Sequence, residues 1–290
     1  MAENEKQKTV GLVLEGGSMR GLFTAGVLDV FMDENIHIDG IVGVSAGAVF
    51  SPNFYSGQRG RALRYNLRFC RDRRYMSLWS LLFTGNMINK QFAFYDVTTK
   101  YDIFDNEAFI KNNKGFYATV TNMETGQPEY FEIRDVLKEL EVLRASSAIP
   151  LVSKPVMLDG KPYLDGGISD SIPVLKGKEL GHDKLIVVRT RPEGYKKEPF
   201  SAGMQKLITR SYRKYPNFAE TMIHRPAMYN ETLATIRDLE QKGKIYVIRP
   251  PRAIQLKTIE RHAGALQEAY NMGVDECKKQ LAGIKEYLQQ

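Results

Sequence analysis

The chain has 290 residues, a formal net charge of +7 at pH 7, and hydrophobic and charged contents of 43% and 26%. These proportions are typical of a globular protein with a substantial core, and they exclude a disordered chain. No apolar run is long enough to span a membrane, and the polar N-terminus lacks the apolar stretch of a secretory signal. Cys70 and Cys277 are too few and too far apart for a disulfide framework or a zinc site. We therefore expect a cytoplasmic or peripherally membrane-bound protein that uses neither a metal nor a cofactor.

The first elements predict a β-α-β unit. Residues 10–15 (VGLVLE) read as a buried strand, and residues 21–35 carry apolar side chains at helical spacing. A second strand is predicted from Ile38 to Val44. Because the strands of such a unit run parallel, the loop after the first strand and the turn after the second open at the same edge of the sheet.

The loop after the first strand is rich in glycine. Its backbone N–H groups would form an anion-binding nest at a helix N-terminus, with a fixed charge from an arginine close by. Beside an activated serine, such a nest acts as an oxyanion hole. The loop lacks the Gly-Lys-Ser/Thr ending of a nucleotide-binding loop, and a serine takes the middle position of a dinucleotide motif. The loop consists of Gly16, Gly17, Ser18, Met19, Arg20 and Gly21.

The second strand ends in Gly43-Val44-Ser45-Ala46-Gly47 and is followed by small, helix-forming residues. A serine at a sharp turn between a strand and a helix has strained backbone angles, and glycines on both sides let the two elements approach each other. Ser45 is the candidate nucleophile, and Gly43 and Gly47 would shape its turn. Taken alone, the pattern also fits an ordinary glycine-rich turn.

Residues 59–94 are basic and aromatic. This composition suits a lid or a patch at a membrane interface, and it equally suits core aromatics beneath solvated arginines. We expect any contact to be with an anionic membrane surface and expect no nucleic acid as partner. The arginine cluster comprises Arg59, Arg61, Arg64, Arg68, Arg71, Arg73 and Arg74.

The middle of the chain predicts more sheet. Strands are expected at 115–121 and 129–133, a helix at 135–146, a hairpin at 155–164 and a buried strand at 184–190. The hairpin ends in Asp165, Gly166 and Gly167. A carboxylate followed by two glycines can point at a neighbouring group, so Asp165 is the second candidate catalytic residue. The alternative is a simple Asx-turn.

The C-terminal part carries no motif with obvious chemistry. A charged loop at 191–202 precedes predicted helices at 204–213 and 218–241, a strand at 244–249, and two helices at 258–272 and 274–288. We expect residues 203–290 to form a mostly helical extension packed on the first part.

Together, the glycine loop, the Ser45 turn and the Asp165-Gly166-Gly167 motif resemble the three signatures of patatin-like phospholipases, and residues 144–150 (RASSAIP) resemble a fourth. The resemblance covers roughly residues 8–190. It implies a three-layer α/β/α fold with a mainly parallel sheet, and a lipid acyl hydrolase that cleaves carboxylic esters of lipids or phospholipids through an acyl-enzyme. Ser45 would be the nucleophile, Asp165 its base and residues 16–21 the oxyanion hole. Ser18 departs from the third glycine usual in the family.

The sequence is also compatible with two other functions. One is a Ser-Asp-His esterase, because His182, His224 and His262 all follow Asp165 in the chain order of a hydrolase triad. The other is a protein without catalytic activity, whose glycine nest and arginines hold phospholipid or another anion.

Overall fold

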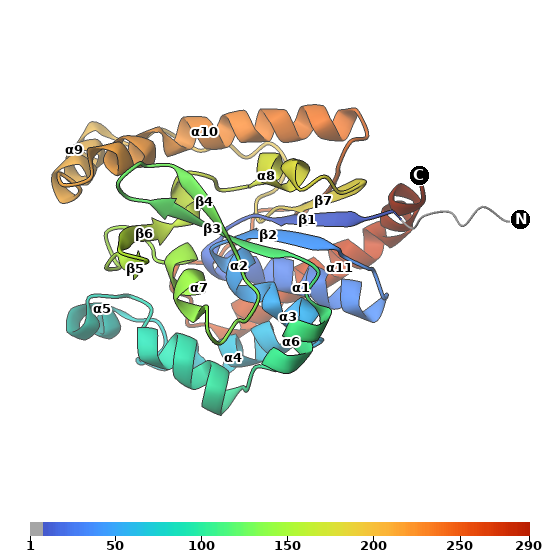
Figure 1. Cartoon of the computed structure of the whole chain (residues 1–290), viewed down its shortest axis with the longest axis horizontal. Helices are drawn as coiled ribbons and strands as arrows, with labels where there is room; N and C mark the ends of the chain where they lie inside the picture. Colours follow the sequence, from blue (N-terminus) through green and yellow to red (C-terminus); the bar gives the residue numbers. More distant parts are fainter. Residues whose placement is uncertain (1–7) are drawn as a thin grey trace, which may run out of the picture.

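The computed structural model describes residues 8–290, which form a three-layer α/β/α fold around an eight-stranded sheet (Figure 1). The sheet order is β5-β6-β3-β2-β1-β7-β8, and β4 pairs with β3 off this path. Residues 1–7, where most of the polar N-terminus falls, lie outside the described part. Within residues 8–290, no helix is both long enough and apolar enough to cross a membrane.

The centre of the sheet is parallel, and one side is antiparallel. β1 pairs in parallel with both β2 and β7, while β6 pairs antiparallel with both β3 and β5. The predicted β-α-β unit is confirmed, since Gly11 of β1 lies opposite Gly40 of β2. The strands are β1 (Val10–Leu14), β2 (Gly40–Val44), β3 (Phe116–Asn122), β4 (Pro128–Glu132), β5 (Val156–Leu158), β6 (Lys161–Asp165), β7 (Lys184–Val188) and β8 (Tyr246–Ile248).

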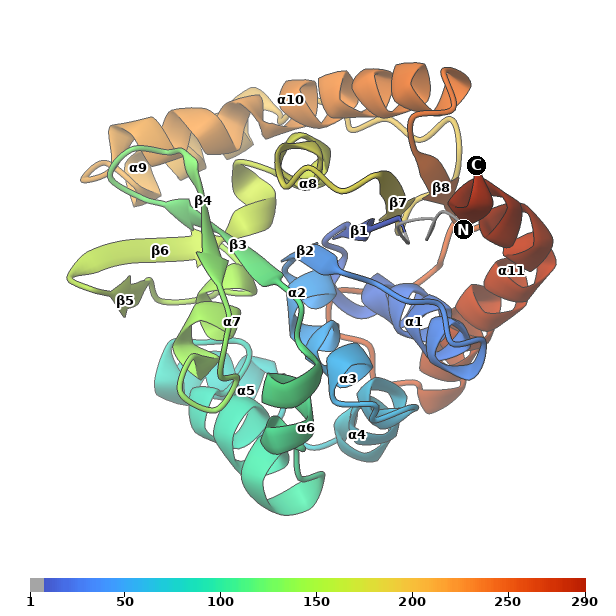
Figure 2. The same ribbon diagram turned by 45° about the vertical axis from the view of Figure 1, so that its right-hand side comes forward.

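Helices cover both faces of the sheet (Figure 2). One face carries α1 (Gly21–Asp33), α2 (Ala46–Phe50), α7 (Leu140–Ser146) and α11 (Ala263–Gln289), and the other carries α8 (Val174–Glu179) and α10 (Pro216–Gln241). The remaining helical segments are α3 (Pro52–Tyr55), α4 (Arg61–Phe69), α5 (Leu78–Thr84), α6 (Asn106–Asn112), α9 (Ala202–Ser211), the π-helix η2 (Lys90–Tyr101) and the 3₁₀ turns η1 (Ser18–Arg20) and η3 (Gly166–Ile168).

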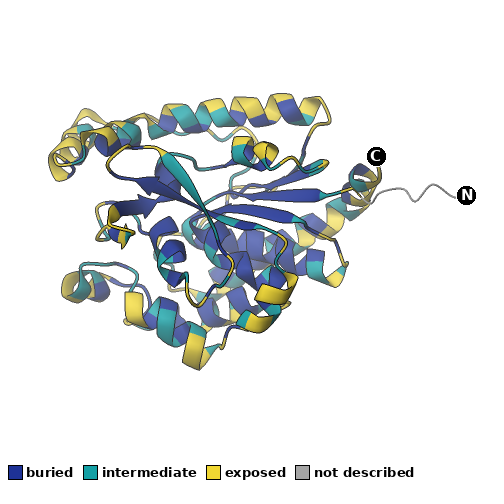
Figure 3. Ribbon diagram, in the orientation of Figure 1, coloured by how far each residue is buried: buried dark blue, intermediate teal, exposed yellow. Residues whose placement is uncertain are grey.

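Successive side chains of the central strands point to opposite faces of the sheet, and they contribute to two hydrophobic cores, one on each face (Figure 3). In β1, Leu12 and Leu14 join the larger core, while Val13 joins the smaller core under α8 and α10. The strands are therefore buried on both faces, as is typical of parallel sheets.

The C-terminus differs from the prediction of two helices. A single helix, α11, runs through Gly273, where the sequence suggested a break. Gly273 faces α1: a Cβ there would overlap the carbonyl oxygen of Phe23, and a Cβ at Gly26 would overlap that of Tyr270. The two glycines thus let α1 and α11 cross with their backbones in close contact. The glycine serves helix packing and not helix termination.

The predicted helix at 135–146 is also shorter in the structure. It begins only at Leu140, because residues 135–139 form a turn in which the Glu139 carboxylate accepts hydrogen bonds from the N–H groups of Arg134 and Asp135. In a helix that began at residue 135, these N–H groups would be unpaired donors at the helix N-terminus. Here the nearby Glu139 carboxylate accepts both of them.

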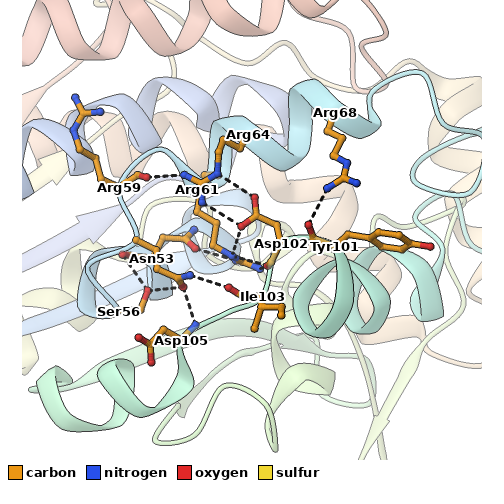
Figure 4. A network of polar contacts seen from close by, with 12 residues as sticks. Asn53, Ser56, Arg59, Arg61, Arg64, Arg68, Tyr101, Asp102, Ile103 and Asp105 are labelled. Carbon is orange, nitrogen blue, oxygen red and sulfur yellow. Dashed lines mark hydrogen bonds and ion pairs between the residues drawn. The ribbon is translucent and has the colours of Figure 1, made fainter.

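Much of the arginine cluster braces the chain itself (Figure 4). Arg61 is buried, and its guanidinium binds the backbone carbonyl of Asp102 and the side chain of Asn53. Arg64 pairs with the Asp102 carboxylate at 3.2 Å. Arg68 donates to the carbonyl of Tyr101, and Arg59 pairs with Asp33. These four arginines join α4 and the residues just before it to the end of η2, to Asp102 and to α1, so they do not form a free basic surface.

Candidate active site

Ser45 sits at the turn between β2 and α2 with φ 54° and ψ −121°, a strained combination for a residue other than glycine. Glycines make the turn feasible. A Cβ on Gly43 would lie 2.8 Å from the backbone N of Ala48, and one on Gly47 would lie 2.7 Å from the carbonyl oxygen of Leu14. Side chains at either position would push α2 away from the sheet. The serine is thereby held at the carboxyl edge, as in a nucleophile elbow.

Asp165 lies beside this serine. The Ser45 hydroxyl donates to Asp165 Oδ2 at 2.7 Å, although 120 residues separate the two in the chain. Asp165 ends β6, which runs antiparallel to β3, and β3 is the parallel neighbour of β2. Its other oxygen, Oδ1, accepts the N–H of Gly167 at 2.7 Å. Burial raises the pKa of the Asp165 carboxyl, and hydrogen bonds from Ser45 and Gly167 partly oppose that rise.

The glycine loop follows β1 and packs against the same serine. A Cβ built on Gly16 would lie 3.2 Å from Cβ of Ser45. The N–H group of Gly16 donates to the Ser171 carbonyl, and that of Arg20 donates to Gly17. The N–H of Gly21 closes the turn on Ser18 and Met19. The N–H groups of Gly17, Ser18 and Met19 have no acceptor among residues 8–290. Within the six-residue loop, the donors available for an anion are thus the N–H groups of these three residues, which are the ones that the sequence suggests for an anion nest.

Ser18 adopts a left-handed backbone with φ 51°, a conformation that favours glycine. Its hydroxyl donates to the carbonyl of Thr258 at 3.1 Å. The side chain thus ties the loop to the segment before α11. This contact accounts for a serine where a third glycine was expected.

All four histidines fall within the described residues, and none of them forms a hydrogen bond with Ser45 or Asp165 or lines a cavity at Ser45. His182 packs against Gly11 and Gly40, at the amino ends of β1 and β2, which is the opposite edge of the sheet. His224 is exposed on α10, with Nδ1 3.0 Å from the carbonyl oxygen of Glu220. His262 caps α11 by accepting the N–H of Ala265. The order of residues in the chain allows a Ser-Asp-His triad, but the structure places no histidine in contact with Ser45 or Asp165.

Two cavities meet at Ser45. The first, of about 100 Å³, has a largely apolar wall formed by α2, α4, η2 and α7, including Phe50, Phe94, Val97 and Leu143. The second, of about 310 Å³, is polar and contains Asp165 together with Arg20, Arg191, Lys197 and Arg225. Ser18, Ser45 and Ile149 line both cavities. The arrangement would place an ester at Ser45 with an apolar chain on one side and a polar group on the other.

Sequence reasoning missed three of the polar residues. Arg191 and Lys197 lie in the charged loop before α9, and Arg225 lies on α10. No motif marks them, since an arginine in a helix is ordinary and only the fold brings this one to the sheet edge. The composition of the 191–202 loop was the only available signal.

Residues 12–176 match the family described as patatin-like phospholipase. The chain belongs to the patatin-like phospholipase family. Residues 215–289 match a domain of unknown function, DUF6363. The matched patatin-like region therefore contains Ser45, the glycine loop and Asp165, whereas Arg225 comes from the second region.

Individual relatives extend over most of the chain. The uncharacterized protein YjjU of Escherichia coli is 32% identical over 91% of this chain and 74% of its own length. The lysophospholipase NTE1 of Candida albicans is 27% identical over 92% of this chain, which spans only 19% of that protein. The solved structure of VipD from Legionella pneumophila aligns with 96% of this chain and 67% of that chain at 12% identity, with a TM-score of 0.47.

Proposed function

We propose that this patatin-like protein is a serine lipid acyl hydrolase that cleaves carboxylic esters with a Ser-Asp dyad. The observation that carries the proposal is the 2.7 Å hydrogen bond from Ser45 Oγ to a buried carboxylate at the meeting point of two cavities. Family membership and the similarity to a protein named lysophospholipase support a lipid ester as substrate.

The first half of the reaction forms an acyl-enzyme. Asp165 accepts the hydroxyl proton while Ser45 Oγ bonds to the carbonyl carbon, and the carbonyl electron pair moves to oxygen. The N–H groups of Gly17, Ser18 and Met19 would hold that oxyanion, each well-placed donor being worth about 3 kcal/mol. Collapse of the tetrahedral intermediate expels the alcohol, which takes the proton from Asp165.

Water completes the cycle. Asp165 accepts a proton from water as the oxygen attacks the acyl carbon, and Ser45 Oγ leaves and takes the proton back. A carboxylate of ordinary pKa is a weak base toward serine. Because burial raises the pKa of Asp165, its affinity for the serine proton is greater than that of an exposed aspartate.

We also propose that the protein works at a membrane surface through α5. Leu78, Trp79, Leu82 and Phe83 of this helix are between 50% and 75% exposed. The helix belongs to a segment whose two ends are joined by a β-bridge between Met76 and Ile88. Both of these residues line the apolar cavity. Exposed Arg73 packs over Trp79 and supplies a charge suited to anionic lipid.

Three exposed apolar sites share one end of the molecule. Figure 1 shows α5, β5 and α9 together at the end opposite the C-terminus. Besides α5, the exposed side chains there are Met157 of β5 and Met204 and Leu207 of α9. The carboxyl edge of the sheet faces this end, so a lipid could pass from the bilayer to Ser45 without crossing the sheet.

The proposed organisation assigns residues 8–190 to the catalytic unit and residues 203–290 to a mostly helical extension. The extension supplies β8 to the sheet, α11 to one face and α10 to the other. It therefore supports the catalytic unit from both sides.

A fluorophosphonate probe tests the proposed function directly. We expect one stable adduct on Ser45, located by peptide mass spectrometry, and no adduct on Ser45→Ala. Replacing His182, His224 and His262 in turn by alanine should leave labelling unchanged. Loss of labelling in one of these variants would favour a Ser-Asp-His esterase, and unlabelled native protein would favour an anion-binding protein without catalysis.

A further inference from the structure

The polar cavity beside Ser45 gathers four basic side chains that the acidic residues of the cavity only partly neutralise. Among residues 8–290, the side chains of Arg20, Arg191, Lys197 and Arg225 have no carboxylate within ion-pair distance. The Nε atoms of Arg20 and Arg225 are buried and have no hydrogen-bond partner there. Buried donors without acceptors are costly, so such donors at a cavity indicate a missing acceptor.

The acidic groups in the cavity already have other partners. Glu15 accepts hydrogen bonds from the backbone N–H of Thr190 and the hydroxyl of Tyr229, both at 2.6 Å. Asp165 is engaged by Ser45 and Gly167. Two acidic residues therefore face four basic ones. The excess charge favours an anion as the natural occupant.

Burial makes this imbalance costly in the empty cavity. It lowers the pKa of Lys197 to about 6, with a further contribution from the positive charge of Arg225. Burial likewise lowers the pKa of Arg225. A bound anion would reverse both effects by pairing with the cations, so binding would be accompanied by proton uptake at Lys197 near neutral pH.

The cations lie within reach of the reacting atoms. A Cβ built on Gly167 would lie 3.0 Å from Asp165 Oδ1 and 3.4 Å from Arg225 Nη2, so the carboxylate and the guanidinium flank the same glycine. Lys197 Nζ lies 3.5 Å from the hydroxyl of Ser171. An anion held here would be part of the same molecule as the ester bound at Ser45, on the side away from the apolar cavity.

Tyr229 in the cavity wall and Tyr195 beside Arg191 do not offer an aromatic cage to a cationic headgroup. Lys197 Nζ lies 3.7 Å from the ring centre of Tyr229, and the Arg191 guanidinium lies 4.4 Å from that of Tyr195. These are the ring faces that would otherwise hold a quaternary ammonium group. Because basic side chains of the protein occupy them, a choline group finds neither an aromatic cage nor a free carboxylate.

We propose that Arg191, Lys197 and Arg225 form a subsite for the phosphate of the substrate, and that the preferred substrate is an acyl ester whose headgroup carries phosphate without a compensating cation. The assignment of an ester rests on the proposed function. The subsite gives a role to α10, which supplies Arg225, and to the loop between β7 and α9, which supplies Arg191 and Lys197.

The first test compares headgroups on one acyl chain. We expect the native protein to hydrolyse 1-acyl-glycerol 3-phosphate with a kcat/KM about 10-fold to 100-fold above that for 1-acyl-glycerol and for the corresponding phosphocholine lipid. A preference of this size corresponds to one or two charge-assisted hydrogen bonds to the phosphate. Arg225→Gln and Lys197→Met should each remove most of this preference, and Arg225→Lys should restore part of it. Arg210→Gln, an exposed arginine on α9, is the matched control.

The ratio of two substrates isolates the headgroup. Arg225 also stabilises the charged form of Asp165, so its loss affects every ester, but the ratio cancels that effect. A ratio near one in the native protein, or a ratio unchanged in Arg225→Gln, would overturn the proposal.

A binding measurement separates the subsite from the catalysis. Calorimetry should show sn-glycerol 3-phosphate binding to native protein with proton uptake, and at least about 10-fold weaker binding to Arg225→Gln. If glycerol 3-phosphate bound but Ser45 was not labelled and no ester was hydrolysed, the phosphate subsite would stand and the proposed function would be wrong. If Ser45 was labelled but glycerol 3-phosphate did not bind, the proposed function would stand and the subsite would be wrong. Inorganic phosphate is expected to compete with the phosphate-bearing ester. If it instead inhibited all esters equally and no headgroup preference existed, the pocket would be a free-phosphate site and the lipid assignment would be wrong.

Discussion

Ser146 holds the backbone of Ser45 in place. The N–H of Ser45 donates to Ser146 Oγ at 3.0 Å, and that hydroxyl donates to the carbonyl of Thr119 at 2.7 Å. Both serines are buried. The hydroxyl thus connects the strained turn after β2 to the neighbouring strand β3, and it would act as a positioning group for the proposed nucleophile.

Replacing Ser146 by alanine should loosen this turn. We expect kcat to fall by about 10-fold to 100-fold, because small displacements of a nucleophile are costly, and the unfolding free energy to fall by about 1–3 kcal/mol, because a buried N–H loses its acceptor. Kinetics with p-nitrophenyl butyrate and urea unfolding measure the two effects. Ser56→Ala, which removes a buried hydroxyl bonded to the Asn53 carbonyl, should reduce stability and leave kcat unchanged. Equal kcat losses in both variants would argue against positioning.

Loss of either dyad member should abolish hydrolysis. Ser45→Ala and Asp165→Asn are expected to lower kcat by about 10³-fold or more, since groups that act as a unit fail together. In the native protein, activity should fall as the pH drops through the pKa of Asp165, which burial places above 3.8, because the protonated carboxyl cannot accept the serine proton. The checks are steady-state kinetics and circular dichroism of each purified variant. Full activity in a folded Asp165→Asn protein would rule out this base.

Polar substitutions on α5 should weaken attachment to lipid. Leu82→Ser combined with Phe83→Ser removes two large exposed apolar side chains, and we expect binding to vesicles that contain phosphatidylglycerol to fall at least about 10-fold. Cosedimentation gives the partition coefficient. Leu175→Ser, which changes a leucine 66% exposed on α8, is the matched control and should bind normally. If native protein did not bind such vesicles, or all three proteins bound equally, α5 would not be the contact.

Asp170 should make stability depend on pH. Its carboxylate accepts the Tyr130 hydroxyl at 2.7 Å, and burial raises its pKa from 3.8 to about 6. The folded state therefore holds this proton more tightly, so the group's stabilising contribution is complete below pH 3.8 and is lost as the pH rises through about 6. The loss amounts to about 3 kcal/mol.

Asp170→Asn imitates the protonated form. We expect this variant to exceed the native protein in unfolding free energy above the folded pKa of Asp170 and to match it below the unfolded pKa. Urea titrations in acidic and neutral buffer provide the comparison. Asp275→Asn, at an exposed position on α11, should show no such divergence. A native protein as stable as the variant at both pH values would contradict the predicted linkage.

The sequence was most informative where local chemistry fixes the geometry. The strand preceding Ser45 and the glycines around it predicted the turn, and the parallel pairing of β1 and β2 brought the glycine loop to it. The position of Asp165 beside Ser45 could be inferred from the family resemblance, but not from spacing, because it depends on β6 pairing with β3.

Other features depend on contacts between distant segments. The partner of Arg61 and Arg64 is Asp102, which no local pattern indicates, so the arginine cluster looked like a free surface. Gly273 looked like a break because the sequence does not reveal that α1 crosses there. Lys197 and Arg225 could not be predicted as site residues, since their proximity to Asp165 arises only when α10 packs over the sheet.

The crossing of α1 and α11 ties the end of the chain to the chemistry at its beginning. α1 starts at Gly21, the last residue of the glycine loop, and α11 rests on it at Gly26. Any side chain introduced at Gly273 would displace α1, which anchors the proposed oxyanion donors, without touching the substrate. Substitutions in this C-terminal helix should therefore change kcat without contacting the substrate. A chain truncated just before Ala263 should lose activity even if the sheet still forms.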